Sequence, residues 1–426
     1  MSDDGRTKPP IRQVPAIRER EKRRVRGLPR LRAPMFAILL SLLVFLSPDL
    51  TLAPLSAGEP HRAGPVPIDQ VGVAVRRPRV QPIDNIAPTP APIPDVVRSR
   101  ADDGQFAAAI SAARAAAGAY GVTFAAVREG ELLWSGADGR QRDARTSLAA
   151  DDPLVIGSVT KTFVAATVLQ LVDEGRLELD DALRDHLPGM SSISTEITIR
   201  QLLDHTSGLA DVFNDRTRRG LEEQPEHAWT TAEVFETLHA PWYGPGQGWA
   251  YANTNYFLLG LVVERVTGSS LATELDERFL GPLELEHTRI LTGAADDGGP
   301  LAPAWATIFW ASGSMTASAA DLARWGDALY GGDILSTRAR TAMTELNSND
   351  YGMGLQRLHL PGAVGYGHTG LLNTYTSLLI HLPEHDLTLA LLVNRSDVNI
   401  GSMLAARPPD GPSLLELVGV EWPPVP

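Results

Sequence analysis

The sequence of 426 residues contains no cysteine. This absence excludes disulfide bonds, thiolate nucleophiles, cysteine-ligated zinc and iron–sulfur clusters. Hydrophobic residues make up 43% of the chain, which is enough for a buried core, so disorder of the whole chain is excluded as well. A catalytic nucleophile in this protein must therefore be an oxygen or an amine.

Positive charge is scarce outside the first 34 residues. That segment carries a net charge of +7 from nine arginines, two lysines and four acidic residues, so the formal total of −13 leaves −20 for residues 35–426. Nucleic-acid binding needs basic surfaces that neutralise phosphates. We therefore expect no nucleic-acid partner.

The apolar run that follows the basic segment is too short for an ordinary transmembrane helix. It comprises residues 35–46, which carry no charge, and Pro48 ends it. A spanning helix needs roughly 20 apolar residues, whereas a signal-peptide core is shorter and follows positive charges. We interpret residues 1–34 as a basic cytoplasmic region and residues 35–57 as a signal peptide or an uncleaved membrane anchor. Either reading places the rest outside the cytoplasm, secreted or tethered, with membrane contact only through this N-terminal segment.

Proline marks the next boundary. Nine prolines lie between Pro60 and Pro94, and a run of this kind favours an extended, polyproline-like spacer. We interpret residues 58–103 as a linker and residues 104–426 as the folded domain, which opens with an alanine-rich helix over residues 107–117.

The folded domain shows strand patterns at both ends and helical patterns between them. The expected strands are 121–127, 131–134, 374–380 and 387–393. The expected helices are 163–172, 256–266 and 317–329. Strands at both ends predict one sheet assembled from the two ends of the domain, with a mainly helical lobe inserted at about residues 160–300.

The first chemical signal is Ser158-x-x-Lys161, placed where an apolar segment turns into a helix. Residues three apart on a helix share a face, so the Lys161 amine can lie beside the Ser158 hydroxyl. A serine hydroxyl becomes a good nucleophile only when a neighbour takes its proton. Lys161 is the only lysine after residue 22, and a desolvated amine can lose its proton near neutral pH whereas guanidinium cannot. We therefore predict Ser158 as the nucleophile.

The second signal is Tyr251-Ala252-Asn253, just before the 256–266 helix. A phenol near cations can act as a phenolate and pass a proton to a leaving group, and an asparagine amide can orient a substrate amide. By itself the tripeptide is also typical of a packed tyrosine followed by a helix cap. Its place between two other signals favours the catalytic interpretation.

The third signal is the stretch His368–Leu371, which enters the 374–380 strand. A cation, a hydroxyl and a glycine on an edge strand suit recognition of a substrate carboxylate, because glycine lets a ligand backbone approach. The same stretch completes a Gly-x-Gly-x-x-Gly match from Gly365, but a dinucleotide fingerprint must follow a strand and open a helix. A strand pattern follows here, so we reject a dinucleotide site.

Two further patterns compete for the chemistry. His381 and His385 fit a zinc-protease pattern that needs both histidines on one helix face, and Pro383 between them argues against such a helix. His205 and Ser207 suggest a catalytic pair, but neighbouring turn residues rarely face each other. We interpret this second pattern as a structural turn.

With these motifs in order, residues 104–395 resemble the serine β-lactamase and penicillin-binding protein superfamily. The resemblance is to the branch of class C β-lactamases, D-alanyl-D-alanine carboxypeptidases and related esterases. Neighbouring stretches add to it, namely residues 202–209, 311–317, 321–324 and 351–355. It implies an α+β fold of the β-lactamase/transpeptidase type, with an antiparallel sheet flanked by helices and an inserted mainly helical lobe. It implies neither a metal nor an organic cofactor.

The resemblance assigns roles to individual residues. Ser158 would form an acyl-enzyme while Lys161 and Tyr251 shuttle protons. The backbone N–H groups of Ser158 and Leu371 would form the oxyanion hole. The predicted catalytic residues are Ser158, Lys161 and Tyr251, and the predicted substrate-binding residues are Asn253, His368, Thr369, Gly370 and Leu371.

Asn253 would contact the substrate amide, and His368 with Thr369 would hold a substrate carboxylate or assist Tyr251. His368 is the main departure from the family pattern, because typical class C β-lactamases have lysine there. A histidine charge depends on pH, so carboxylate recognition should weaken as the pH rises through the imidazole pKa. This departure argues against efficient β-lactamase action.

Three hypotheses stay open. The first is a D-alanyl-D-alanine carboxypeptidase-like hydrolase that β-lactams also acylate, and the second is an esterase of the same fold acting on a small acyl ester or envelope lipid. The third is a non-catalytic envelope-binding protein, against which Lys161 and Tyr251 argue. The expected partners are a small peptide, β-lactam or ester substrate, and the sequence leaves the oligomeric state open.

Overall fold

The computed structural model describes residues 100–420 except 189, 191–192, 194–195, 295–297 and 361. The predicted basic region, the export segment and nearly all of the linker lie outside the described residues. Helix α2 spans Arg100–Ala117 and so begins inside the segment predicted as linker. Gly104, where we placed the boundary, lies within this helix. One glycine costs a helix only about 1 kcal/mol, which is too little to end a helix that Phe106 and Ile110 anchor in the core.

Six strands form one antiparallel sheet in the order β2-β1-β9-β8-β7-β6. The strands are β1 (Gly121–Arg128), β2 (Glu131–Gly139), β6 (Gln356–Leu360), β7 (Ala363–Leu372), β8 (Tyr375–Leu382) and β9 (Leu387–Val393). β1, near the start of the domain, pairs with β9, near its end, and places Ala125 opposite Ala390. The predicted α+β class and the sheet assembled from both ends are thus confirmed.

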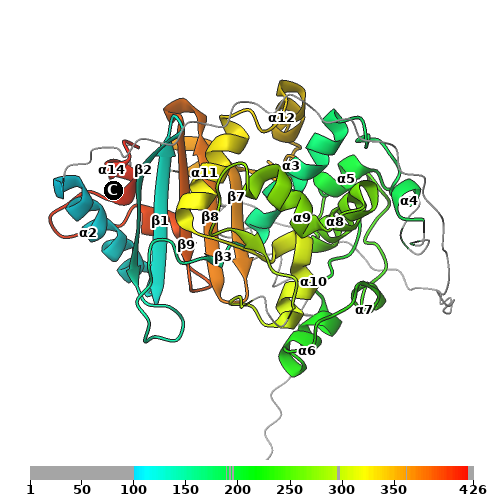
Figure 1. The fold of residues 1–426 in the computed structure, drawn as a ribbon, viewed down its shortest axis with the longest axis horizontal. Coiled ribbons are helices and arrows are strands. Elements are labelled where there is room, and N and C mark those ends of the chain that lie inside the picture. Colours follow the sequence, from blue (N-terminus) through cyan, green and yellow to red (C-terminus); the bar gives the residue numbers. More distant parts are fainter. Residues whose placement is uncertain are drawn as a thin grey trace, which may run out of the picture.

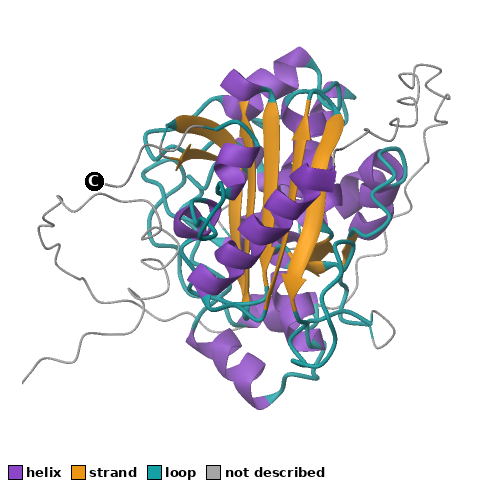
Figure 2. Ribbon diagram, turned by 90° about the vertical axis from the view of Figure 1, so that its left-hand side faces the viewer, coloured by secondary structure: helices purple, strands orange, loops and turns teal. Residues whose placement is uncertain are grey.

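Helices cover both faces of this sheet (Figures 1 and 2). On one face lie α2, α13 (Ile400–Leu404) and α14 (Leu414–Leu417), and on the other lies α11 (Ala319–Tyr330). Ile380 packs in the core on the α2 side, whereas its neighbour Leu379 packs on the α11 side. Burial on both faces explains the apolar runs Leu378–Ile380 in β8 and Leu389–Val393 in β9.

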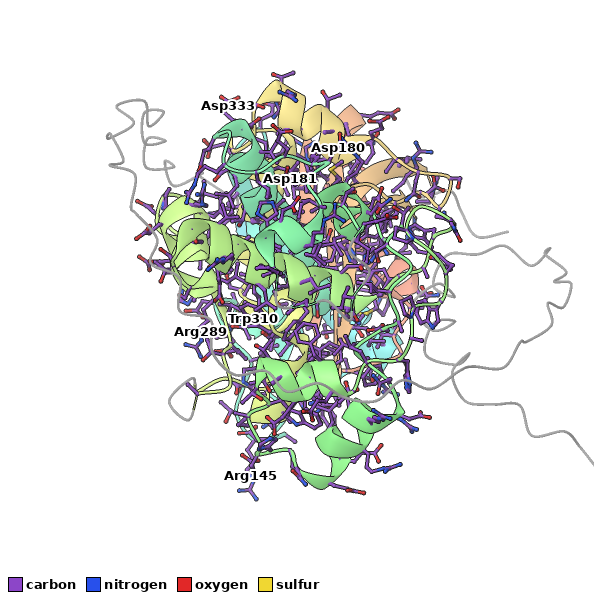
Figure 3. The ribbon with its side chains drawn as sticks, turned by 90° about the vertical axis from the view of Figure 1, so that its right-hand side faces the viewer. Arg145, Asp180, Asp181, Arg289, Trp310 and Asp333 are labelled. Atoms are coloured by element: carbon purple, nitrogen blue, oxygen red, sulfur yellow. The ribbon has the colours of Figure 1, made fainter. Side chains whose placement is uncertain are left out.

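The helical lobe lies on the α11 side of the sheet (Figure 1). Its central helices α3 (Thr160–Asp173), α8 (Asn253–Thr267) and α10 (Pro303–Gly313) pack on one another. The shorter elements are α4 (Leu183–His186), α5 (Ile199–Leu203), α6 (Asp215–Glu223), α7 (Thr231–Glu236), α9 (Leu271–Leu275), a π-helical turn (Asp276–Leu280) and α12 (Thr337–Thr344). Figure 3 views the molecule from this side, with Asp180 near its upper end and Arg145 near its lower end.

A small second sheet connects the two parts of the domain. Its central strand β5 (Met315–Ala317) pairs with β3 (Leu154–Val155) and β4 (Arg289–Ile290). Because β3 leads directly to the start of α3, this sheet fixes the segment that carries Ser158. None of the helices that the structure describes has the length and apolar character needed to cross a bilayer.

Candidate active site

Ser158 lies where the small sheet ends and α3 begins. It belongs to a single 3-10 turn, Gly157–Val159, that runs into the helix. Gly157 has a φ of +51°, a left-handed conformation that favours glycine, and a Cβ there would lie 2.9 Å from the backbone nitrogen of Leu371. The glycine therefore lets the serine turn approach β7, and the Ser158 side chain stays partly exposed.

Lys161 follows one turn later and is completely buried. Its Nζ lies 3.1 Å from Ser158 Oγ, 2.8 Å from Asn253 Oδ1 and 2.7 Å from the Ser312 carbonyl oxygen. Burial lowers the pKa of Lys161 to about 7, against the opposing effect of the Asp211 charge. The ammonium form donates to all three oxygens, whereas the neutral amine donates to two and can accept the Ser158 proton. Both states are available near neutral pH, as a general base needs.

Tyr251 contacts the same hydroxyl. Its OH donates to Ser158 Oγ over 2.8 Å, and the Lys161 Nζ lies 4.8 Å from the centroid of its ring. Burial raises the pKa of Tyr251 above the usual phenol value, although the hydrogen bond to Ser158 acts in the other direction. The resting form is therefore the protonated phenol. Tyr251 stands ready to give a proton, and Lys161 is the group that can take one.

Asp211 is a site residue that the sequence did not reveal. Its carboxylate accepts hydrogen bonds from the Asn253 backbone N–H at 3.2 Å, from Asn253 Nδ2 at 3.2 Å and from the Phe213 N–H at 3.0 Å. Because Asn253 Oδ1 accepts from Lys161, both ends of the amide that was expected to contact a substrate are already paired. Asn253 thus links Asp211 to Lys161. No signal marked Asp211, which lies in a loop between α5 and α6.

The stretch His368–Leu371 lies on a strand of its own, β7, and not at the entry of β8 as predicted. Asn373, with a φ of +54°, makes the turn between the two strands. β6 pairs with β7 only as far as Gly367, and the edge of β7 beyond that residue lies against the 3-10 turn that carries the nucleophile. Gly370 is required on this edge, because a Cβ would meet the Ile156 carbonyl oxygen at 2.0 Å.

His368 is buried, and both of its ring nitrogens are paired. Nε2 lies 3.1 Å from the Tyr351 OH, and Nδ1 lies 2.5 Å from the Thr369 carbonyl oxygen. Burial, together with the Lys161 charge, lowers the pKa of His368 to about 3. The expectation of a cation that titrates near neutral pH is therefore wrong, because a buried imidazolium would lose its hydration. The Thr369 hydroxyl is engaged as well, since it donates to Gln356 Oε1 at 3.2 Å.

The structure brings the predicted nucleophile, base and proton donor into one cluster with β7 alongside. Within the described part of the chain, no three His, Asp or Glu side chains are grouped so as to hold a metal ion. A serine hydroxyl between an amine of pKa about 7 and a protonated phenol can carry out acyl transfer by proton exchange alone.

Comparison with known sequences points the same way. The model of the family described as Beta-lactamase matches residues 106–403. Penicillin-binding protein 4 of Amycolatopsis lactamdurans is 28% identical over 312 residues, which cover 64% of this chain and 80% of that protein. Protein flp of Staphylococcus aureus strain MW2 is 31% identical over 173 residues, and this match spans only 39% of the chain and 34% of that protein.

Solved structures share the fold. The D-stereospecific amidohydrolase from Streptomyces sp. is 30% identical with a TM-score of 0.59, covering 68% of this chain and 94% of that one. The octameric penicillin-binding protein homologue from Pyrococcus abyssi is 24% identical with a TM-score of 0.60, covering 75% and 78%. Because the family match extends over more than half of the sequence, the protein belongs to the beta-lactamase family, within the serine β-lactamase and penicillin-binding protein superfamily that its motifs predicted.

Proposed function

We propose that the protein is a serine hydrolase of the D-alanyl-D-alanine carboxypeptidase type that works through an acyl-enzyme on Ser158. The observation that carries the proposal is the position of the Ser158 hydroxyl, 3.1 Å from the Lys161 amine and 2.8 Å from the Tyr251 hydroxyl. A nucleophile, a base with a pKa of about 7 and a protonated acid in one cluster are the groups that acyl transfer needs.

Acylation uses the neutral form of Lys161. The amine takes the proton of Ser158, and Oγ attacks the substrate carbonyl carbon. The backbone N–H groups of Ser158 and Leu371 stabilise the oxyanion. Tyr251 gives its proton to the leaving nitrogen as the tetrahedral intermediate collapses, and the resulting phenolate lies beside the Lys161 ammonium.

Deacylation restores the starting protonation states. The Tyr251 phenolate takes a proton from water, and the hydroxide attacks the Ser158 ester. As the ester breaks, the Lys161 ammonium returns its proton to the serine Oγ. No step of this scheme uses a cofactor.

Two relatives support a peptide or amide substrate. One is named a penicillin-binding protein and the other a D-stereospecific amidohydrolase. We therefore propose short peptides that end in D-alanyl-D-alanine as the substrate class, with β-lactams as acylating analogues of the same peptide end.

A hydrolase of uncharged esters or amides is the second candidate, and the state of His368 favours it. A carboxypeptidase holds a free C-terminal carboxylate, which a cation would stabilise. Burial lowers the pKa of His368 to about 3, so this residue supplies no cation, and Asp211 adds a carboxyl group to the site. A small acyl ester, an envelope lipid ester or an amidated peptide places no carboxylate at this end.

Intact mass of the full chain after incubation with a reporter penicillin tests the acyl-enzyme, with Ser158→Ala as the matched variant. We expect the parent to gain the mass of one penicillin and the variant to gain none. A peptide ending in D-alanyl-D-alanine and its C-terminal amide then separate the two candidates, because a carboxypeptidase prefers the free acid. A folded parent that forms no adduct and hydrolyses neither peptide would favour the ester hydrolase, and a further failure to hydrolyse a nitrophenyl ester would leave the non-catalytic binding protein.

We also propose that the reaction takes place outside the cytoplasm. The support is the basic segment followed by the uncharged run of residues 35–46. Fractionation of cells that express the full chain, with N-terminal sequencing of the recovered protein, tests this proposal. Recovery in the cytosol with an intact N-terminus would overturn it.

A further inference from the structure

A second polar network lies beside Tyr251, and the proposed chemistry makes no use of it. At its centre is His205, completely buried in the turn after α5 with a φ of +64°. We predicted this turn to be merely structural. The other side chains of the network, all buried, belong to Ser207, Asn255, Tyr351 and His368.

Backbone groups fix the direction of the hydrogen bonds on one side of His205. The Leu209 N–H donates to Ser207 Oγ at 3.2 Å, so the Ser207 hydroxyl proton goes to Asn255 Oδ1 at 2.6 Å. That contact turns Asn255 Nδ2 toward His205 Nδ1, 2.8 Å away, and the Ala252 N–H meets the same ring nitrogen at 3.3 Å. An N–H group cannot accept, so Nδ1 is the acceptor and the His205 proton lies on Nε2.

The network continues from His205 Nε2 to the active site. Nε2–H donates to the Tyr351 OH at 3.2 Å, and Tyr351 in turn donates to His368 Nε2 at 3.1 Å. His368 Nδ1 faces the Thr369 carbonyl oxygen at 2.5 Å, which can only accept, so His368 carries its proton on Nδ1. With a backbone donor at one end and a backbone acceptor at the other, no member can reverse without losing a bond.

His205 also holds both neighbours of Tyr251. The Ala250 N–H donates to the His205 carbonyl oxygen at 3.1 Å, and the Ala252 N–H donates to the His205 ring. The rings of His205 and Tyr251 lie 4.3 Å apart between centroids. A shift of this segment would separate the Tyr251 hydroxyl from Ser158 Oγ, now 2.8 Å away, and misplacement by 1 Å can cost about 100-fold in rate.

We propose that His205 is a positioning residue of the reaction: protonated on Nε2 and uncharged, it holds Tyr251 against Ser158 and, through Tyr351, locks His368 with its proton on Nδ1. This inference rests on the proposed function of Ser158 and Tyr251, and it adds a residue and a tautomer that the function alone does not require. In the locked state His368 offers no N–H to a substrate. Recognition then falls to the backbone edge of β7 beyond Gly367, where Gln356 Oε1 accepts from the Thr369 N–H.

The tautomers can be tested without any activity measurement. Long-range proton–nitrogen correlation spectra of the full chain labelled with 15N-histidine report which ring nitrogen carries the proton, and His205→Gln and His368→Gln assign the signals. We expect His205 protonated on Nε2 and His368 protonated on Nδ1. Tyr351→Phe keeps the ring and removes the linking hydroxyl, so His368 should change toward a mixture of tautomers, whereas His205 should stay protonated on Nε2 because the Ala252 N–H still donates to its Nδ1. Nε2–H on His368 in the parent, or an unchanged His368 in Tyr351→Phe, would overturn the lock.

Acylation kinetics with the reporter penicillin test the positioning of Tyr251. We expect His205→Gln to lower the acylation rate constant about 100-fold, and to leave the dissociation constant of the penicillin within about twofold. Tyr251→Phe added to His205→Gln should lower the rate little further, because the two residues act through one hydroxyl. A double variant that shows the full product of the two single losses would point to a merely structural role and overturn the proposal.

His381→Gln is the matched control for these measurements. His381 is a buried histidine on β8, paired with Thr388 Oγ1 at 2.9 Å, and we expect parental acylation from this variant. If His205→Gln does not fold, Tyr351→Phe replaces it in the spectra. A parent without a penicillin adduct would defeat the proposed function, whereas a parent with an adduct and a His205→Gln of parental rate would defeat only the positioning inference.

Discussion

Two polar clusters meet beside Ser158, and they differ in whether their charge can change. The charged cluster consists of Lys161, Asn253 and Asp211. The neutral cluster consists of His205, Tyr351 and His368. In the charged cluster, burial brings the pKa of the amine to about 7. In the neutral cluster, burial lowers the pKa of both imidazoles and raises that of the phenol, so all three groups stay uncharged at neutral pH.

The comparison shows how one physical cause, the loss of water, gives two outcomes. In the charged cluster the Asp211 carboxylate opposes the loss of the Lys161 proton. The pKa of the amine therefore stays close to neutral pH, and Lys161 can gain or lose a proton during a reaction. The partners within the neutral cluster are dipoles, which direct hydrogen bonds and stabilise no ion. We infer that the charged cluster sets the pH dependence of the chemistry and the neutral cluster sets its geometry.

Lys161→Arg should have the largest effect on the charged cluster. Guanidinium keeps both its positive charge and its proton, so only the base is lost. We expect the rate of acylation by the reporter penicillin to fall by about 1,000-fold or more. Arg278→Lys, an exchange in the ion pair with Glu174 and Glu274, is the control and should keep the parental rate. A Lys161→Arg variant that retains more than about a tenth of the rate would contradict the choice of base.

Asp211→Asn should have a smaller effect and should move the pH profile. In the parent we expect acylation to rise with pH and to level off above about 7, because only neutral Lys161 takes the Ser158 proton. The Asp211 charge raises the pKa of Lys161, so its removal lowers that pKa and moves the midpoint to lower pH. We also expect the plateau to fall about tenfold, because Asn253 loses a charged acceptor.

Rates of penicillin acylation measured from pH 5 to 9, a range of about two units around the expected midpoint, check the Asp211 prediction. Asp321→Asn provides the control, since Asp321 is a buried aspartate that accepts from the His287 N–H and Thr288 Oγ1 away from the site. Asp321→Asn should leave the midpoint in place. A midpoint that rises or stays fixed in Asp211→Asn would show that the Asp211 charge does not raise the pKa of Lys161.

Helix geometry made part of the charged cluster predictable from the sequence. Ser158 and Lys161 are three residues apart at the start of one helix, so their contact followed from local spacing. Asp211 reaches Asn253 across 42 residues from a loop without a recognisable pattern, and only the folded chain brings the two together.

The neutral cluster was less predictable, because packing decides its protonation. The residue type allows a charged His368, but burial, together with the charge of Lys161 from a distant part of the sequence, lowers its pKa and removes the charge. The end of β7 was also hard to predict, because it depends on the turn at Asn373. Asparagine tolerates the left-handed backbone of this turn, but the residue type alone does not show that the turn is there. β9, by contrast, matches the predicted 387–393, since a continuous apolar run between turn residues leaves few alternatives.

Gln356→Ala should have the smallest effect. This variant tests whether the contacts between Gln356 and Thr369 disfavour binding of a substrate carboxylate. Gln356 Oε1 accepts from Thr369 Oγ1 at 3.2 Å and from the Thr369 N–H at 3.3 Å, so both donors that a carboxylate would use are occupied. Their release should lower KM about two- to threefold for a D-alanyl-D-alanine peptide with a free C-terminus, at unchanged kcat. Gln356→Glu is the matched control, because its added charge should raise KM for the acid and spare the C-terminal amide. If Gln356→Ala lowers KM equally for the acid and the amide, Gln356 only limits the access of both peptides to the site. Other residues would then distinguish the free C-terminal carboxylate from the amide.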